Sequence, residues 1–192
     1  VKMAVTPLWE DTLSTQQFGT IGRYQILEEV GRGGMAIVYK VVDTDLNRIV
    51  AIKLIWKTAF PPDELEPILN RFKREAKALA KIDHPNIVKL LDYGEFDGAP
   101  FLAMEFLEGR TLKELKKPIP VKTAVQLLRP VANALQYIHG KNLLHRDVKP
   151  SNIIITKQRK VVLTDFGIAK WIAESQDTLT LTGTGVGIGT PE

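Results

Sequence analysis

The chain has 192 residues, of which 44% are hydrophobic, and this is enough to bury the core of one or two compact units. Its 26 basic and 22 acidic residues lie in short, scattered clusters typical of solvated helix faces, so the formal charge of +4 does not indicate a nucleic-acid partner. The sequence contains no cysteine, which excludes disulfide bridges and thiolate metal sites and fits a reducing compartment.

Residues 1–22 mix polar residues and glycines with Pro7 and show no clear period, so we interpret them as a leader or linker. The first residues lack the charged and long apolar segments of a secretory signal. No apolar run in the chain reaches the ~18 residues that would cross a bilayer. The sequence therefore predicts a soluble chain without a membrane segment.

Residues 23–107 are expected to form a sheet with one helix. Five runs rich in β-branched and aromatic residues predict antiparallel strands. These runs are residues 23–30, 37–45, 48–56, 87–95 and 100–107. A polar turn that contains Asp97 and Gly98 joins the last two. Residues 68–82 repeat apolar side chains at helical spacing, which predicts the helix.

The second half of the chain is mainly helical in pattern. Residues 111–117 predict a short helix and residues 121–139 a longer one. Pro130 removes a backbone donor from the longer helix and should distort it locally. Residues 152–156 and 160–165 predict two further short strands.

A glycine-rich loop, Gly31 to Val38 (GRGGMAIV), lies between two predicted strands rather than between a strand and a helix. This position argues against a dinucleotide-binding fold. Glycines let backbone N–H groups approach phosphate oxygens closely, because no Cβ intervenes. Taken alone, the loop is explained about as well by a tight structural hairpin.

Lys53 ends the sequence VAIK in a strand that is otherwise aliphatic. If its ammonium group is turned inward, it needs an anionic partner; the alternative is a solvated lysine on the outer face. Glu75 lies on the face of the helix 68–82 that should pack against the sheet, so it is the candidate partner.

Two polar segments follow the long helix. The loop His145 to Asn152 (HRDVKPSN) packs an aspartate, a lysine and an asparagine into six residues, although a plain polar turn would also explain it. Asp165 to Gly167 (DFG) follows a predicted strand and begins thirteen residues after Asn152. Oxygen ligands at the ends of two strands suit a hard divalent cation, and Mg²⁺ is the natural occupant.

Together these motifs resemble the signature set of protein kinases, closest to the bacterial eukaryotic-like serine/threonine kinases. They occur in the family's order and at its spacing, over Tyr24 to Glu192. The resemblance implies an α+β, bilobal fold. Its N-lobe, residues 23–106, is a five-stranded antiparallel sheet plus one helix, and its C-lobe, residues 107–192, is helical and incomplete. Because the chain ends before the family's APE motif, we expect a kinase domain cut short or one piece of a longer protein.

The resemblance implies that ATP binds between the two lobes, with Met104 as gatekeeper and with the backbone from Glu105 to Leu107 bonding the adenine. The residues implied in ATP binding are Val30, Gly31, Arg32, Gly33, Gly34, Met35, Ala36, Val38, Ala51, Lys53, Met104, Glu105, Leu107 and Ile154. Ala36 departs from the family pattern because it replaces the third glycine of the loop, and this should change ATP affinity modestly.

The resemblance also implies the catalytic roles. Lys53 holds the α- and β-phosphates, and Glu75 holds Lys53. Asp147 accepts the proton of the substrate hydroxyl, while Lys149 lies near the γ-phosphate and is typical of the serine/threonine class. The implied ligands of Mg²⁺ are Asn152 and Asp165.

The remaining motif residues are implied to regulate or to pack. His145 is expected to pack in the family's stacked core with Leu79, Leu90 and Phe166, and His84 and His139 receive the same packing interpretation. The tail 179–192 (LTLTGTGVGIGTPE) occupies the position of the activation segment, with Thr182 and Thr184 as phosphosites. Arg146 is the implied phosphothreonine partner. The alternative is that these threonines only fill a loop.

The resemblance implies an ATP- and Mg²⁺-dependent serine/threonine protein kinase with protein substrates, regulated by phosphorylation of its activation segment. A homodimer that phosphorylates itself in trans is a candidate partner. The expected location is the cytoplasm, either free or as the cytoplasmic part of a membrane-tethered protein. The alternative is a nucleotide-binding scaffold without turnover, and the threonine-rich segment disfavours a small-molecule kinase.

Overall fold

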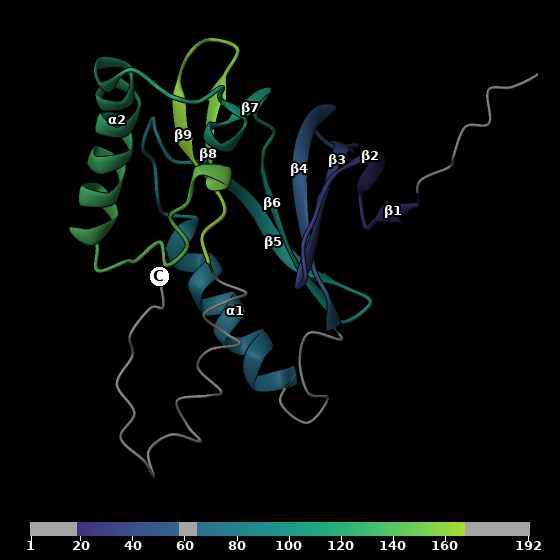
Figure 1. The fold of residues 1–192 in the computed structure, drawn as a ribbon. Helices are drawn as coiled ribbons and strands as arrows, with labels where there is room; N and C mark the ends of the chain where they lie inside the picture. The colour runs from purple at the N-terminus through teal and green to yellow at the C-terminus, as the bar shows by residue number, and fades with distance from the viewer. Residues whose placement is uncertain (1–18, 58–64, 168–192) are drawn as a thin grey trace, which may run out of the picture.

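The computed structural model describes residues 19–57 and 65–167, and its main feature is a six-stranded antiparallel sheet (Figure 1). The strand order is β1-β2-β3-β4-β6-β5. The strands are β1 Thr20–Ile21, β2 Tyr24–Arg32, β3 Ala36–Asp43, β4 Arg48–Ile55, β5 Leu90–Phe96 and β6 Ala99–Glu105. The five predicted strands are therefore present, and β1 is an additional one.

Strand β1 corrects the prediction of a five-stranded sheet. Ile21 pairs with Tyr24, and its side chain is only 2% exposed because it enters the core on one face of the sheet. Two residues are too few to show the alternation of apolar and polar side chains that marks a strand in a sequence. The strand lies within residues 1–22, which we had interpreted as a leader or linker.

The central strands β3, β4 and β6 pair without register shifts. Successive side chains on β4 alternate between the two faces of the sheet. Val50 and Ile52 enter a core on one face, with Tyr24 and Phe101. The face that carries Ala51 and Lys53 borders a cavity instead. Strand register thus determines which face Lys53 occupies.

Helix α1, Leu65–Leu79, packs against β5 and β6. Ile68, Phe72 and Ala76 are buried at helical spacing, as the sequence predicted for the apolar face. The helix begins three residues earlier than predicted and ends at Leu79, and Ile82 is buried in the turn that follows.

The second part of the chain combines helix α2 with a small three-stranded sheet. Its elements are β7 Gly109–Thr111, the 3₁₀ helices η3 Leu112–Glu114 and η4 Pro150–Asn152, α2 Val121–His139, β8 Ile153–Thr156 and β9 Val161–Leu163. The strand order is β7-β8-β9, and α2 packs against β9 (Figure 1). Helix α2 runs without a break through Pro130, so the expected distortion does not interrupt it.

The short helix predicted over residues 111–117 is confined to the single turn of η3. Thr111 and Glu114 bracket this turn, because the backbone N–H of Thr111 donates to the Glu114 carboxylate over 2.5 Å. The preceding strand β7 was not predicted, because three residues carry too little pattern.

The two parts share a core and a backbone connection. Val88 N–H donates to Leu163 O over 2.9 Å, and Leu163 N–H donates to Asn86 O over 2.8 Å. Phe166 lies in one buried cluster with residues of α1, α2 and the large sheet. These contacts fix the end of β9 against the large sheet, and the site lies at this junction.

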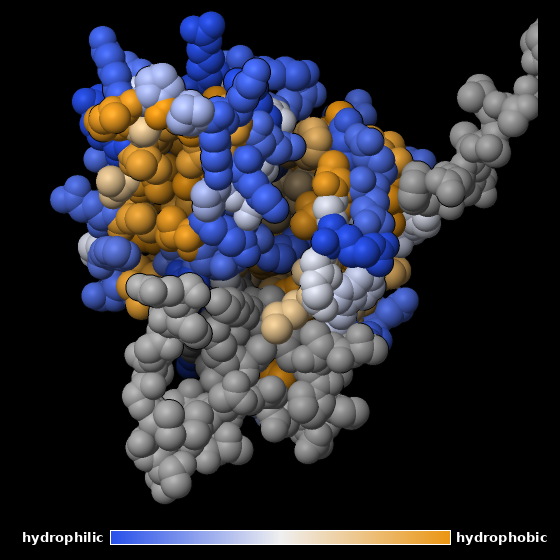
Figure 2. Space-filling model, viewed as in Figure 1, coloured by the Kyte–Doolittle hydropathy of each residue, from blue (hydrophilic) through white to orange (hydrophobic). Residues whose placement is uncertain are grey.

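The outer surface of α2 is partly apolar. Val121, Val125 and Leu128 are exposed, and Figure 2 shows apolar surface over this helix. Within residues 19–57 and 65–167, no helix combines the length and the apolar character needed to cross a membrane.

Candidate active site

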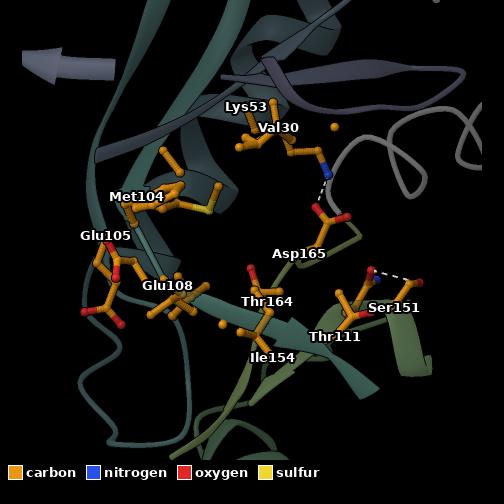
Figure 3. Close-up of a pocket in the computed structure, with 18 of the residues that line it drawn as sticks. Val30, Lys53, Met104, Glu105, Glu108, Thr111, Ser151, Ile154, Thr164 and Asp165 are labelled. Atoms are coloured by element: carbon orange, nitrogen blue, oxygen red, sulfur yellow. Dashed lines mark hydrogen bonds and ion pairs between the residues drawn. The ribbon is translucent and has the colours of Figure 1, made fainter. Parts of the chain in front are cut away.

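A cavity of about 560 Å³ lies between the large sheet and the small sheet (Figure 3). Val38, Ala51 and Met104 line it from β3, β4 and β6, and Ile154 lines it from β8 on the opposite side. An adjoining cavity of about 610 Å³ extends under the glycine-rich loop. Every residue that the sequence implied in ATP binding lines at least one of these two cavities.

Lys53 and Asp165 meet across the cavity. Lys53 Nζ donates to Asp165 Oδ1, and Figure 3 shows the lysine side chain reaching from β4 toward the carboxylate. The Lys53 side chain is only 13% exposed, so its ammonium group is turned inward with an anionic partner. The alternative of a solvated lysine on the outer face is wrong.

The structure does not pair Lys53 with Glu75. Among the described residues, Asp165 is the anion that pairs with Lys53, and Glu75 Oε1 lies 4.0 Å from Arg74 Nε. Glu75 also lines neither cavity. The two side chains do not meet because they are directed to different places. Lys53 reaches from β4 to Asp165, in the segment after β9, whereas the helix that carries Glu75 packs on β5 and β6.

Asp147 is held by two neighbours in the loop. Asn152 Nδ2 donates to the backbone oxygen of Asp147 over 2.8 Å and to its Oδ2 over 2.9 Å. Lys149 Nζ lies 2.7 Å from the same Oδ2. Asp147, Lys149 and Asn152 all line the adjoining cavity together with Asp165. The structure thus brings the predicted polar residues of both motifs to one place.

His145, the first residue of this loop, is buried against the segment that follows β9. Its side chain is 2% exposed, its Nε2 lies 3.0 Å from Thr164 O, and its ring centroid lies 4.6 Å from that of Phe166. Burial lowers the pKa of His145, and the bond to Thr164 O opposes this only in part. A buried ring with a lowered pKa agrees with the predicted packing role.

The other two histidines differ from each other. His84 stacks on Tyr137 with ring centroids 5.0 Å apart, and its Nδ1 accepts a hydrogen bond from Asn86 N–H over 3.1 Å. His139 is exposed at the end of α2, so the packing interpretation is wrong for this residue.

Sequence reasoning missed several other residues that line the first cavity. They are Lys40, Val88, Glu108, Gly109, Arg110, Thr111, Glu114, Ser151 and Thr164. One signal was available, because Gly109 is a glycine only four residues after β6 ends at Glu105. A Cβ on Gly109 would lie 2.3 Å from Ile155 O, so the close approach of β7 to β8 requires glycine.

The residues present fit a magnesium ion. The Asn152 amide nitrogen donates to Asp147, its Oδ1 lies 3.5 Å from Ser151 Oγ, and Asp165 supplies a carboxylate. Within the described ranges, no group of three or more His, Asp or Glu side chains could form a metal cage. One carboxylate and one amide suit Mg²⁺, which is usually held by one or two protein oxygens together with substrate phosphates and water.

The two predicted phosphosites, Thr182 and Thr184, lie outside the described residues. Their proposed partner Arg146 lies inside them, in the loop before Asp147, with a φ of 63°.

Comparisons with known proteins identify several relatives. The sequence model of the protein kinase domain matches residues 24–186. A probable serine/threonine-protein kinase of Clostridium perfringens is 42% identical over 171 residues, which cover 88% of this chain and 24% of that protein. The serine/threonine-protein kinase PrkC of Bacillus subtilis is 41% identical over 162 residues, which cover 83% of this chain and 24% of PrkC.

Solved structures give the same result. The crystal structure of a Mycobacterium tuberculosis PknI kinase domain matches with a TM-score of 0.69 and 30% sequence identity, covering 86% of this chain and 64% of that chain. The chain spans about a quarter of the length of the two curated relatives.

Proposed function

The chain belongs to the protein kinase domain family, and on this premise we propose that it transfers the γ-phosphoryl group of ATP to serine or threonine hydroxyls of proteins. The observation that carries the proposal is the convergence of Lys53, Asp147, Asn152 and Asp165 on adjoining cavities. Phosphoryl transfer needs positioning and charge stabilisation, and these four side chains can supply both.

ATP would bind with its adenine in the apolar cavity and its phosphates under the glycine-rich loop. Val38 and Ala51 on one side and Ile154 on the other give the cavity apolar walls. Met104 lines its inner end, next to the backbone of Glu105 to Leu107. An apolar slot with a few polar groups at one end is a typical site for such a ligand.

Asp147 is proposed as the group that accepts the proton of the substrate hydroxyl. The oxygen of that hydroxyl forms a bond to the γ-phosphorus, the bond to the bridging oxygen of ADP breaks, and the proton moves to the Asp147 carboxylate. Hydrogen bonds from Asn152 and Lys149 hold the carboxylate in place. Asn152 and Asp165 would hold Mg²⁺, which neutralises charge on the phosphates.

Lys53 is proposed to contact the phosphates, and Glu75 to hold Lys53 during turnover. In the described conformation the ammonium group is paired with Asp165. Turnover would then require Lys53 to exchange partners, with Asp165 becoming free to bind the metal ion. This exchange calls for α1 to approach β4.

Substrates, partners and regulation are also proposals. Lys149 beside Asp147 favours serine and threonine hydroxyls of proteins, and a homodimer would allow phosphorylation in trans. Phosphate on Thr182 or Thr184 would be held by the guanidinium group of Arg146. The use of ATP on protein targets favours a cytoplasmic location.

The test is incubation of the protein with radiolabelled ATP, Mg²⁺ and casein, followed by mass-spectrometric mapping of phosphosites. Lys53→Met should weaken nucleotide binding and abolish labelling, because the phosphates lose their counter-charge. Lys40→Met is the matched control, since Lys40 also lines the cavity from a strand but pairs with Glu28 at 2.9 Å. Saturable ATP binding without labelling of casein or of the chain itself would favour the nucleotide-binding scaffold.

A further inference from the structure

The tip of the glycine-rich loop, Gly33 to Met35, is held by Trp56, the first residue after β4. The backbone N–H of Trp56 donates to Met35 O over 2.9 Å. Its indole Nε1 also donates to Gly33 O over 3.4 Å. Both ends of the tip are thus bonded to one residue, through its backbone and through its side chain.

Arg32 adds a second contact to the same indole. Its guanidinium carbon lies 5.4 Å from the centroid of the Trp56 ring, within the range of a cation–π interaction. The guanidinium group is itself fixed by two hydrogen bonds to the Glu29 carboxylate, of 2.9 and 2.6 Å. The strand that leads into the loop is therefore tied to Trp56 as well.

Little else packs against the tip. A Cβ placed on Gly31 or Gly34 would meet no heavy atom within 4 Å, and one on Gly33 would meet only Ala36 O, at 3.7 Å. Glycines lose more conformational freedom than other residues when they are ordered. A loop with three glycines and little packing depends strongly on the few contacts that hold it.

Trp56 acts on the loop and not on the space beneath it. The loop lines the cavity that also contains Asp147 and Asp165, whereas Trp56 lines neither cavity. None of the described residues accepts a hydrogen bond from the N–H groups of Gly34 or Met35. Those groups are free to donate to phosphate oxygens, provided that the tip stays in place.

We infer that Trp56 is a positioning residue that holds the glycine-rich loop ready for the phosphates of the nucleotide, through Gly33 O and Arg32. The inference rests on the proposed function, because it concerns how that nucleotide is bound. With Trp56 in place, binding does not have to order the tip, so the affinity for ATP is higher than the glycines alone would allow.

The first experiment needs no nucleotide. Hydrogen exchange of the Gly33 amide, which donates to Ala36 O over 2.8 Å, reports on opening of the tip. Trp56→Phe keeps a ring for Arg32 but removes the indole donor, and Trp56→Leu removes both contacts. Exchange should be roughly 2- to 10-fold faster in Trp56→Phe, the scale of one neutral hydrogen bond, and faster again in Trp56→Leu. Lys57→Ala, the exposed neighbouring residue, is the control and should leave the exchange rate unchanged.

The second experiment measures the nucleotide. The KM for ATP should rise by roughly 3- to 10-fold in Trp56→Phe, because part of the binding free energy is then used to order the loop. The kcat should stay within about twofold, because Trp56 does not touch the reacting groups.

The outcomes separate this inference from the proposed function. If the wild-type protein neither binds nor uses ATP, the proposed function fails, while the exchange experiment still reports on the contact of Trp56 with the loop. If ATP is used but both Trp56 variants match wild type in exchange rate or in KM, the inference is overturned. A thermal unfolding scan distinguishes a local effect from a misfolded variant, and Trp56→Phe is the conservative change that should keep the fold.

Discussion

The two walls of the cavity are built in different ways. One wall consists of strands β3, β4 and β6 in unbroken antiparallel register, which places Val38, Lys53 and Leu102 side by side. The other wall includes residues 145–167, where Asp147, Lys149 and Asp165 lie in loops. There Arg146 and Asp165 have φ angles of 63° and 64°, in the left-handed region that L-residues rarely occupy.

This difference shows what each wall depends on. In the strand wall, repeated backbone hydrogen bonds fix the backbone and therefore the face on which each side chain lies, whatever its chemistry. In the loop wall, each residue with a positive φ costs about 1–3 kcal/mol, and individual contacts have to offset that cost. Two of these contacts are the bonds from Asn152 to Asp147 and from Gly167 N–H to His145 O. The chemically active carboxylates lie on the wall with fewer repeated bonds.

The largest effect should come from the loop wall, through Asp147→Asn. The substitution keeps an oxygen that can accept from Asn152 and Lys149, so the loop geometry should survive. It removes the proton acceptor, and kcat should fall by at least ~10²-fold with little change in nucleotide affinity. Steady-state kinetics and calorimetric titration with Mg-ATP would measure the two quantities.

The control for this variant is Asp92→Asn, on β5 outside the cavities, where the carboxylate pairs with Arg23 at 3.0 Å. It should leave kcat unchanged. If Asp147→Asn has the kcat of the wild-type protein, Asp147 is not the proton acceptor. The loop wall would then not carry the catalytic chemistry proposed for it.

The contrast between the walls also explains what the sequence could predict. The strands that carry Val38, Ala51 and Lys53 were predicted because runs of eight or nine residues rich in β-branched and aromatic side chains are a strong signal, but the sequence left open which face Lys53 occupies. The short strands β1 and β7 gave no such signal. The cavity-lining residues around Gly109 were missed for the same reason, since their position follows from the β7–β8 pairing.

Side-chain pairing across the cavity was less predictable. The spacing of Glu75 on its helix predicted that it faces the sheet, but whether Glu75 or Asp165 pairs with Lys53 depends on how α1 is placed against the sheet. That placement is a tertiary property which no local pattern encodes. By contrast, the contact of Asn152 with Asp147 lies within one short loop, and the two residues were correctly predicted to belong to one site.

A second test concerns the backbone of the small sheet on the side of the loop wall, through Gly109→Ala. The new Cβ would lie 2.3 Å from Ile155 O and 2.8 Å from the Cα of Thr156, so the β7–β8 pair has to shift. Overpacking of this kind costs about 1–3 kcal/mol of unfolding free energy. Gly31→Ala is the matched control, because nothing lies within 4 Å of its Cβ position. Equal midpoints in denaturant unfolding of the two variants would show that the small sheet accommodates the added methyl group without loss of stability.

A third test asks whether the two walls exchange partners during turnover, through Glu75→Gln. The free energy of unfolding should change by less than about 0.5 kcal/mol, because Glu75 forms no pair with Lys53 in the described conformation. If the proposed Lys53–Glu75 pair forms during turnover, kcat should fall roughly tenfold, the scale of one charge-assisted hydrogen bond.

The control for Glu75→Gln is Glu66→Gln, in the first turn of the same helix and exposed. It should change neither quantity. A Glu75→Gln protein with unchanged kcat would mean that Lys53 keeps Asp165 as its partner, or needs none, throughout the reaction.

The smallest effect is expected in the strand wall, through Ala36→Gly. Ala36 begins β3, pairs with Ile55 and is 8% exposed, so its methyl group packs in the core beneath the loop. Glycine would restore the family's usual residue but would cost about 0.5–1 kcal/mol of stability in a strand. The KM for ATP should change by less than about tenfold, because the strand's hydrogen bonds keep the loop's base in place whichever residue is present.

Ala103→Gly is the control for this last prediction, since Ala103 is fully buried in β6 and lines neither cavity. It should lose comparable stability with no change in KM. If Ala36→Gly instead shifts the KM by several hundredfold, the base of the loop is not fixed by strand pairing. The strand wall would then depend on individual side chains in the same way as the loop wall, and the distinction between the two walls would fail at Ala36.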